Sequence, residues 1–158
     1  MQDFTACTNK QPNAENCFVC GRSNTSGLKM QFFDDGIDTI ISTIALDKRF
    51  EGYPGIVHGG ILATMLDEVV GRCAMIKDHH HFMMTVTLDV KYRLPVPIGE
   101  KIRIVGTSTR MKGRIGKARG EILLADGRVA CESEMVLSTM PEHLASEDRS
   151  NDLGWRID

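Results

Sequence analysis

The sequence predicts an α+β domain in which one long central helix is wrapped by a curved antiparallel sheet of about five to six strands. Two strand-like segments come before an apolar segment at residues 58–77, and four more follow it. A helix that is apolar on nearly every side is a buried helix. A curved sheet folded around it would cover it, and 158 residues are enough for one such domain.

The segment before the helix, residues 27–46, is expected to form a hairpin. Asp35-Gly36 divides it into two stretches, and Asp-Gly is a strong signal for a tight turn between paired strands. The helix that follows carries apolar side chains around most of its circumference, at Ile61, Leu62, Met65, Leu66, Val69, Val70, Cys73 and Ala74.

The second half of the chain predicts four strands. Residues 84–93 alternate with a period of two, which indicates an apolar face and a polar face, with Thr85 on the polar one. The remaining strands are expected at about 101–111, 114–125 and 128–139, with turns at Lys112-Gly113 and Asp126-Gly127.

The two ends of the chain lack these patterns. Residues 1–16 are polar and aperiodic and are expected to be a flexible tail, so the domain is assigned to residues 17–140. Residues 141–158 begin at a proline and are expected to form a C-terminal tail, which is either mobile or packed as a peripheral helix.

Composition disfavours several classes of partner. The formal net charge is −2 and the isoelectric point is about 6.2, which argues against nucleic acid and anionic membranes. No segment has the pattern of a signal peptide or a membrane span. The five cysteines are odd in number and scattered, and this predicts a reducing, cytoplasmic location rather than a disulfide framework.

One stripe of the predicted helix differs from the rest. Its members follow at spacings of four, three and four and therefore share a face: Gly60, Thr64, Asp67 and Gly71. Asp67 is the only ionisable group among them, and a carboxylate there needs a hydrogen-bonding partner or a chemical task. Glu68 points elsewhere and is expected to form a helix-surface salt bridge with Arg72.

The start of the helix offers bare backbone donors. Gly59 and Gly60 have N–H groups without intrahelical acceptors, glycine permits close approach, and the helix dipole adds positive potential. This arrangement suits a developing oxyanion, although a tight turn alone would also select glycine. His58 stands at the cap, where bonding the preceding loop is an alternative to a role in the site.

Asp67 and Gly59 cannot act on the same carbonyl within one chain. They are eight residues apart, which is roughly 12 Å along a helix, whereas a base and an oxyanion donor must both lie about 3 Å from one reacting group. If both are catalytic, Asp67 acts with Gly59 of a second chain. The sequence therefore predicts a homodimer with composite active sites and leaves a homotetramer open.

These motifs resemble a known family. The "HGG" at 58–60, an aspartate nine residues after the histidine, and the strand ending "VKYRLPVPIG" are similar to the hotdog-fold acyl-CoA thioesterases of the PaaI-like type. The resemblance covers about residues 17–139, including "FEGYPGIVHGGILATMLD" and the upstream "CFVCG". It implies the fold predicted above, hydrolysis of an acyl-CoA thioester to free acid and CoA, and no cofactor apart from the CoA of the substrate.

The resemblance also implies a role for each matching residue. Asp67 corresponds to the catalytic carboxylate, acting as general base on water or as nucleophile, and Gly59 to the backbone donor to the thioester carbonyl. His58 corresponds to the residue that orients the glycine turn, and Thr85 to a hydroxyl that helps to hold the water. Some relatives carry Asn or Gln where this chain has Gly52, so carbonyl activation here would rest on backbone alone.

Further residues are candidates for binding substrate. Arginine and lysine suit the phosphates of CoA, and a basic cluster falls at a predicted hairpin tip; the alternative is that this tip is only solvated. The candidates are Gly60, Lys91, Arg93, Arg110, Lys112 and Arg114. The acyl group, and the choice between CoA and an acyl carrier protein, stay open.

The cysteines suggest two rival interpretations. Cys17 and Cys20 could bind zinc, but a structural site needs four ligands, and the others would have to come from Cys7 and residues 79–81. No metal is therefore predicted. A cysteine nucleophile is a second possibility, but the sequence places no histidine base beside one.

Two other functions remain within the same fold. A hydratase or dehydratase would pair a histidine with an acid, yet His58 and Asp67 lie about 13 Å apart along the helix. A non-catalytic acyl-CoA-binding or regulatory protein is the main alternative to the thioesterase, because a fold does not fix a function. A pure binder has no need of a carboxylate at Asp67, which favours the enzyme.

Overall fold

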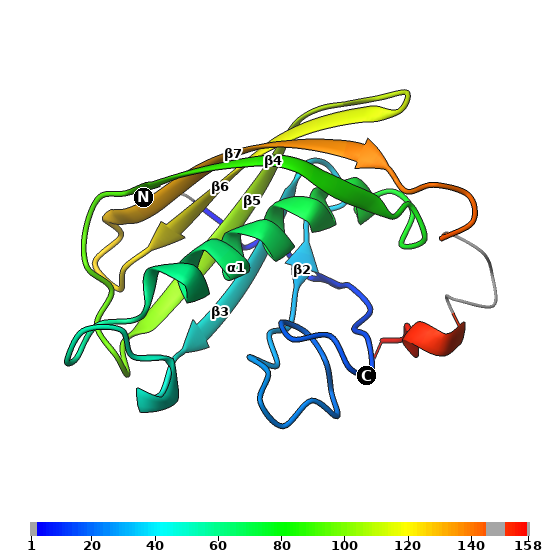
Figure 1. The fold of residues 1–158 in the computed structure, drawn as a ribbon. Coiled ribbons are helices and arrows are strands. Elements are labelled where there is room, and N and C mark those ends of the chain that lie inside the picture. The colour runs from blue at the N-terminus through cyan, green and yellow to red at the C-terminus, as the bar shows by residue number, and fades with distance from the viewer. Residues whose placement is uncertain (1–2, 145–150, 158) are drawn as a thin grey trace.

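The computed structural model describes residues 3–144 and 151–157. Within them, one sheet of seven strands curves around a central helix (Figure 1), and every strand pair is antiparallel. The spatial order of the strands is β1-β2-β3-β5-β6-β7-β4. The predicted α+β hotdog arrangement is confirmed, with two very short strands, β1 and β2, among the seven.

The helices and strands have the following bounds. The strands are β1 (Asn9–Lys10), β2 (Phe33–Asp34), β3 (Thr39–Ala45), β4 (Met83–Tyr92), β5 (Lys101–Lys112), β6 (Ile115–Leu123) and β7 (Val129–Thr139). The helices are α1 (Gly59–Gly71) and two 3₁₀ helices, η1 (Lys48–Phe50) and η2 (Arg72–Met75). The predicted helix at 58–77 is thus an α-helix that tightens into a 3₁₀ turn at its end.

The predicted turns form at glycines that have positive φ angles. Gly36, Gly113 and Gly127 have φ of 72°, 62° and 86°, in the left-handed region that favours glycine. Asp35 reinforces the first turn, because its carboxylate accepts hydrogen bonds from the N–H groups of three following residues. The hairpin expected in residues 27–46 therefore forms, although its first strand is only Phe33–Asp34.

Helix α1 packs closely against the concave side of the sheet. Its core side chains, from Leu62 to Val70, are buried, and such burial stabilises a fold by about 1.5–3 kcal/mol per large side chain. Two glycines of the sheet allow the close approach. A Cβ at Gly106 would lie 2.7 Å from the carbonyl oxygen of Val69, and one at Gly120 would lie 2.8 Å from Cγ2 of Val70.

The expectation of a flexible N-terminal tail is wrong for residues 3–16. Strand β1 pairs with β2, and Gln11, Asn13 and Ala14 are buried. Part of the segment binds a buried arginine: Arg72, only 1% exposed, donates to the carbonyl oxygen of Pro12 (2.8 Å) and to Oδ1 of Asn13 (3.3 Å). The polar side chains of Gln11 and Asn13 thus form buried hydrogen bonds and do not face solvent.

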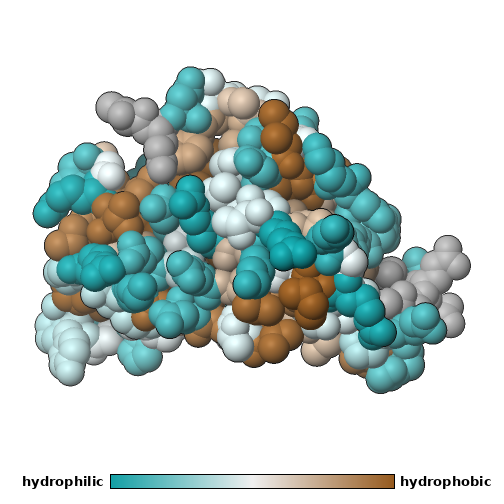
Figure 2. All heavy atoms as spheres, turned by 90° about the horizontal axis from the view of Figure 1, so that it is seen from above, coloured by the Kyte–Doolittle hydropathy of each residue, from teal (hydrophilic) through white to brown (hydrophobic). Residues whose placement is uncertain are grey.

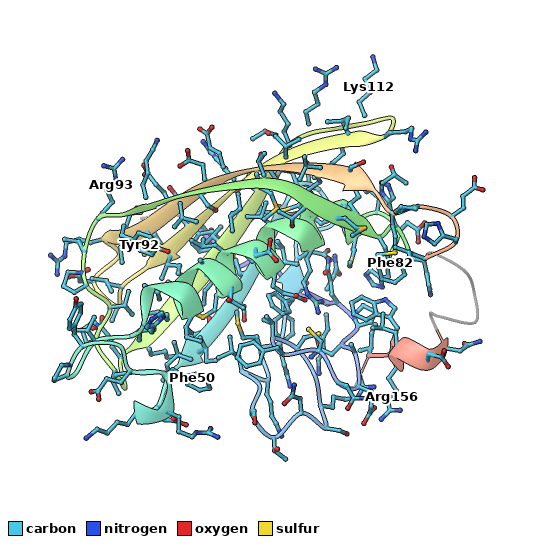
Figure 3. The ribbon with its side chains drawn as sticks, viewed as in Figure 1. Phe50, Phe82, Tyr92, Arg93, Lys112 and Arg156 are labelled. Atoms are coloured by element: carbon cyan, nitrogen blue, oxygen red, sulfur yellow. The ribbon has the colours of Figure 1, made fainter. Side chains whose placement is uncertain are left out.

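Of the two expectations for the C-terminal tail, packing holds for residues 151–157. Residues 151–153 are helical, and Arg156 forms a bridge with Asn13. The indole N–H of Trp155 donates to the carbonyl oxygen of His79 (2.9 Å), and its ring packs edge-on against Phe82, at 5.6 Å between centroids. Figure 3 shows Phe82 and Arg156 at this end of the molecule. Residues 145–150 lie outside the described residues.

Strand β4 forms one edge of the sheet. It is ten residues long and exposes three large apolar side chains, Met84 (44%), Val86 (59%) and Tyr92 (54%). A long edge with exposed apolar residues is a template for pairing with another chain.

The adjoining outer face of the sheet is largely hydrophilic, with smaller hydrophobic patches (Figure 2). Among the described residues, no helix has the length and apolarity that crossing a membrane would need.

Candidate active site

Asp67 and Thr85 meet between the central helix and the edge strand. Asp67 lies midway along α1, and its Oδ1 accepts a hydrogen bond of 2.8 Å from the hydroxyl of Thr85 on β4. The hydroxyl also lies 3.7 Å from the sulfur of Met135. A carboxylate of the helix and a hydroxyl of the strand, 18 residues apart in the sequence, are thereby held together.

A β-bulge directs Thr85 toward the helix, which corrects the prediction that it shares one polar face with the rest of its strand. The pairing of β4 with β7 shifts between Thr85 and Thr87, so Val86 is an extra residue. Thr85 pairs with the buried Leu137, whereas Val86 has no partner on β7. Strict alternation would have pointed Thr85 away from Asp67, and bulges occur often beside functional sites because they redirect a side chain.

The small-residue stripe of α1 is open on one side in the single chain, so the helix is not buried all round as expected. Gly60 is exposed, Thr64, Asp67 and Gly71 are partly exposed, and a Cβ at Gly71 would meet no other atom within 4 Å. Thr64 is bonded to the helix itself, because its hydroxyl donates to the carbonyl oxygen of Gly60 (2.8 Å). The hydroxyl of Thr64 thus bonds its own helix, whereas the carboxylate of Asp67 points away from the helix toward β4.

At the helix start, His58 caps the helix by accepting a hydrogen bond from one of the two glycines, Gly60. Its Nδ1 accepts a hydrogen bond of 2.9 Å from the backbone N–H of Gly60, and the backbone N–H of His58 donates to the carbonyl oxygen of Phe50. The N–H of Gly60 is therefore occupied by the cap. The N–H of Gly59 has no acceptor among the described residues, which leaves it as the donor available to a ligand.

The position where this chain departs from some relatives has a local explanation. A Cβ at Gly52 would lie 3.0 Å from Cα and 3.3 Å from Cβ of His58. A larger side chain would therefore displace the histidine that caps the helix. Gly52 supports the cap by leaving room for it.

Tyr92 is a site residue that the sequence analysis did not single out. Its hydroxyl donates to the carbonyl oxygen of Gly59 (3.0 Å), and its ring lies 3.5 Å from where a Cβ of Gly59 would be. Figure 3 shows the side chain directed from β4 toward the helix. Next to it lies a pocket lined largely by apolar residues, including Ile56, Leu62 and Leu94. The "KY" of the strand motif was the available signal.

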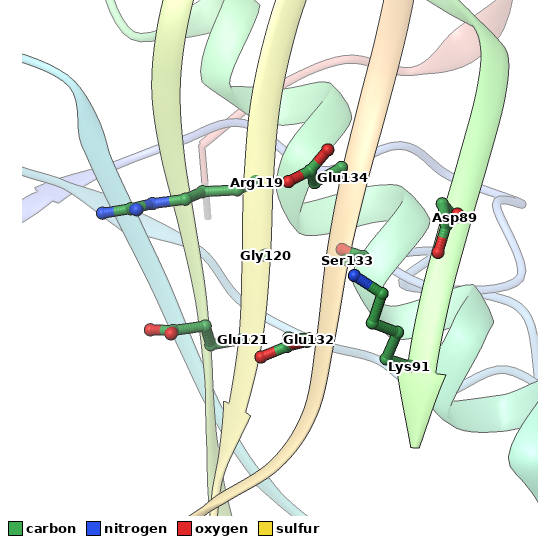
Figure 4. A pocket seen from close by; sticks show the side chains of 8 residues that line it. All are labelled: Asp89, Lys91, Arg119, Gly120, Glu121, Glu132, Ser133 and Glu134. Carbon is green, nitrogen blue, oxygen red and sulfur yellow. The ribbon is translucent and has the colours of Figure 1, made fainter. Parts of the chain in front are cut away.

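Lys91 and Arg93 lie away from Asp67. Lys91 lines a pocket on the outer face of the sheet together with several acids (Figure 4), namely Asp89, Glu121, Glu132 and Glu134. Arg93 donates to Glu132 at 2.5 Å, and this hydrogen bond lowers the pKa of the Glu132 carboxyl. Carboxylates compete with phosphate for both cations, so these two are the weaker candidates for contact with CoA.

The basic hairpin tip is better placed. Arg110, Lys112 and Arg114 are exposed at the β5–β6 turn, and Lys112 points away from the molecule in Figure 3. Thr85 pairs with Leu137, and Leu137 pairs with Gly116, so one row of residues connects the candidate site to this hairpin. The tip begins two residues beyond that row, at Arg114.

The Glu68–Arg72 pair forms as predicted, but inside the protein. Nε of Arg72 lies 2.8 Å from Oε1 of Glu68, and the guanidinium stacks over the ring of Phe32, 4.0 Å from its centroid. Cys17 lies on the other side of Glu68, 4.0 Å from Oε2. A hydrogen bond from Cys20 lowers the pKa of the Cys17 thiol, and the same bond raises the pKa of Cys20.

The central part of the chain matches a family model. Residues 54–131, which contain the helix start, Asp67 and Thr85, match the model described as the thioesterase superfamily. This part of the chain is similar to the thioesterase superfamily. The match confirms the family resemblance, and the solved structures of thioesterase superfamily proteins confirm the fold.

Three thioesterase relatives illustrate the similarity. Acyl-coenzyme A thioesterase THEM4 of Rattus norvegicus is 28% identical over 96 residues, covering 59% of this chain and 40% of that protein. The crystal structure of a thioesterase superfamily protein has a TM-score of 0.70 at 29% identity, covering 77% of this chain and 59% of that one. A hypothetical thioesterase of Streptococcus pneumoniae, solved with coenzyme A, has a TM-score of 0.61 at 17% identity, covering 65% and 82%.

The similarity to curated relatives covers only part of their length. The chain spans less than half the length of the curated relatives it matches, between 25% and 43% of each. Similarity over this part supports the family resemblance and the fold. The assignment of substrate and mechanism rests on the residues of this chain.

Proposed function

We propose that this chain is an acyl-CoA thioesterase, a thioester hydrolase that converts an acyl-CoA to a free acid and CoA. The match of residues 54–131 to the superfamily model supports this, as does the name of the rat relative. The observation that carries the proposal is the Asp67–Thr85 hydrogen bond on a small-residue stripe that is open on one side. A carboxylate held there by a hydroxyl is suited to activating water.

In the proposed mechanism, Asp67 acts as the general base. Thr85 donates to Oδ1, which fixes the carboxylate and leaves Oδ2 to accept a proton from water. The water oxygen attacks the thioester carbonyl carbon, and negative charge develops on the carbonyl oxygen. When the C–S bond breaks, the acid is released and the CoA sulfur takes up the proton that Asp67 accepted from water. Coenzyme A enters only as part of the substrate, and the hydrolysis requires no cofactor.

The oxyanion is stabilised by the N–H of Gly59 at the start of a helix. His58 holds that turn by bonding the N–H of Gly60, and Tyr92 holds it by bonding the carbonyl oxygen of Gly59. Because Gly59 and Asp67 are roughly 12 Å apart along the helix axis, the donor comes from a second copy of the chain. Gly60 contributes through the shape of the turn, since its N–H is already bonded.

The second copy is expected to pair along strand β4, which forms a homodimer with two composite sites. β4 exposes Met84 and Val86 at the edge of the sheet, next to the open stripe of α1. A twofold axis between two copies would bring each Asp67 toward the partner's Gly59. Further association to a tetramer is compatible with this arrangement.

The basic tip at Arg110, Lys112 and Arg114 would hold the phosphates of CoA. A cytoplasmic location fits five free thiols.

The test is thiol release from a panel of acyl-CoAs of short, long and aromatic acyl groups. Wild type is compared with Asp67→Asn, and the protein's own thiols are subtracted with a blank lacking substrate. We expect turnover by wild type and a loss of about two or more orders of magnitude in the variant. Asp78→Asn, an exposed aspartate in the connector after η2, is the matched control and should keep full activity.

Two outcomes would contradict parts of the proposal. Turnover that survives Asp67→Asn would leave the activity but exclude the assigned base. Acyl-CoA binding without turnover of any member of the panel would favour the acyl-CoA-binding regulator. Mixed dimers of Asp67→Asn and Gly59→Val chains test the composite sites, since one of their two sites would be intact and should regain activity.

A further inference from the structure

Three groups with metal-binding chemistry converge on the side of α1 that faces the N-terminal segment. The sulfurs of Cys17 and Cys20 and a carboxylate oxygen of Glu68 all lie within 4.8 Å of one another. Cys20 is buried, with 2% of its surface exposed, while Cys17 and the Glu68 side chain (22%) are partly open. The cluster is thus accessible from one side, and the proposed hydrolysis uses none of its members.

The backbone of the "CFVCG" turn presents both sulfurs for ligation. The N–H groups of Val19 and Cys20 point at Sγ of Cys17 (3.3 and 3.5 Å), and the N–H of Ala14 points at Sγ of Cys20 (3.4 Å). Hydrogen bonds of this kind stabilise sulfur in its thiolate form. Gly21 closes the turn, because a Cβ there would lie only 2.2 Å from the carbonyl oxygen of Cys17.

Glu68 is oriented as the third ligand by a buried cation. Arg72 holds Oε1 of the carboxylate at 2.8 Å and is itself fixed by Pro12 and Asn13. The other oxygen, Oε2, is therefore turned toward the sulfur of Cys17, at 4.0 Å. Partners that orient a ligating carboxylate in this way are a regular part of metal sites.

The carboxylate of Glu68 adds a negative charge beside the two sulfurs. The hydrogen bond from Cys20 lowers the pKa of Cys17, and the negative charge of Glu68 opposes this shift. A cation placed between the groups would remove that repulsion. Two thiolates and one carboxylate carry three negative charges, and a divalent cation together with the guanidinium of Arg72 carries three positive ones.

We propose that Cys17, Cys20 and Glu68 bind one divalent cation of the thiophilic class, of which Zn²⁺ is the biological representative. The two thiols release their protons to solvent on binding, and water from the open side completes four-coordination. The site would connect the N-terminal segment to the central helix and leave one coordination position to water. This proposal is independent of the hydrolytic function and is tested without an activity assay.

The test uses Co²⁺ as a spectroscopic substitute for Zn²⁺. Reduced protein, freed of metal by a chelator, is titrated with Co²⁺ and then with competing Zn²⁺. We expect thiolate-to-cobalt charge-transfer absorption that saturates at one ion per chain and disappears when Zn²⁺ displaces it. Cys17→Ser and Cys20→Ser should each abolish the thiolate band, and Glu68→Gln should weaken binding by about tenfold or more.

The matched control is Cys7→Ser, which alters a cysteine outside the cluster and should leave the titration unchanged. Circular dichroism of each variant confirms that it is folded, and the wild-type spectrum alone tests sulfur ligation if a variant is not. Absence of a thiolate band at saturating Co²⁺ would overturn the proposal. So would conversion of Cys17 and Cys20 to a disulfide by a small-molecule disulfide in protein with no metal affinity, which would identify a redox pair.

Discussion

Replacing Arg72 by methionine should destabilise the domain strongly, although the residue lies outside the candidate active site. Its guanidinium is 1% exposed and makes three polar contacts, with Glu68, Pro12 and Asn13. Methionine matches much of the side-chain volume but leaves the other three groups without a partner. Breaking a buried ion pair typically costs about 3–5 kcal/mol, and each orphaned buried acceptor costs about 1–3 kcal/mol.

Relaxation of the N-terminal segment would recover part of these costs, so we expect Arg72→Met to lower the free energy of unfolding by about 3–5 kcal/mol. That is a large fraction of the roughly 5–15 kcal/mol typical of a domain. Urea denaturation measures it, at fixed protein concentration because an oligomer's stability depends on concentration. A chelator is present throughout, so that no bound cation contributes.

A double-mutant cycle identifies the source of the loss. Glu68→Gln removes the charge partner, and the coupling between the two substitutions isolates their pair from the contacts with the N-terminal segment. Arg110→Met is the matched control on the exposed hairpin and should change stability by about 0.5 kcal/mol or less. A loss below about 1 kcal/mol for Arg72→Met would refute the reasoning, because it would mean that the buried contacts contribute little.

Three further substitutions test the contacts around the helix. Thr85→Val should lower kcat/KM by about tenfold or more while Thr85→Ser retains it, since only the hydroxyl orients Asp67; equal activity of both would exclude that role. Tyr92→Phe should cost about 0.5–1.5 kcal/mol in thermal or urea unfolding through its lost hydrogen bond to Gly59, and an unchanged midpoint would show that the bond is not formed in solution. Gly120→Ala should cost about 1–3 kcal/mol by overpacking against α1, and a stability gain would contradict the close approach.

The sequence predicted the elements where local chemistry decides the structure. The Asp-Gly and Lys-Gly turns formed as expected because their glycines adopt left-handed backbone conformations that other residues avoid. The apolar periodicity predicted α1 and the long strands for a similar reason, since burial follows directly from the pattern. The Glu68–Arg72 pair was also predictable, because a spacing of four residues places both side chains on one side of a helix.

The features that were missed depend on contacts between distant parts of the chain. Nothing local to Thr85 signals the bulge at Val86 that turns it toward Asp67. The polar N-terminal segment had the composition of a tail, and its contacts with Arg72, which lies about 60 residues away, could not be read from it. Glu68 was assigned to the surface for the same reason, and this concealed a third ligand close to Cys17 and Cys20.

Asp67 and Glu68 are adjacent in the chain, and the fold uses them on different sides of the same helix. Successive residues of an α-helix are separated by about 100° around its axis, so Asp67 points to β4 while Glu68 points to the N-terminal segment. Any rotation of α1 would move Asp67 relative to Thr85, and a misplacement of about 1 Å can cost about 10²-fold in rate. The buried Arg72 and the close contact at Gly120 resist that rotation from opposite sides. Under the proposed mechanism, the N-terminal segment would therefore contribute to catalysis by fixing the orientation of the helix that carries Asp67.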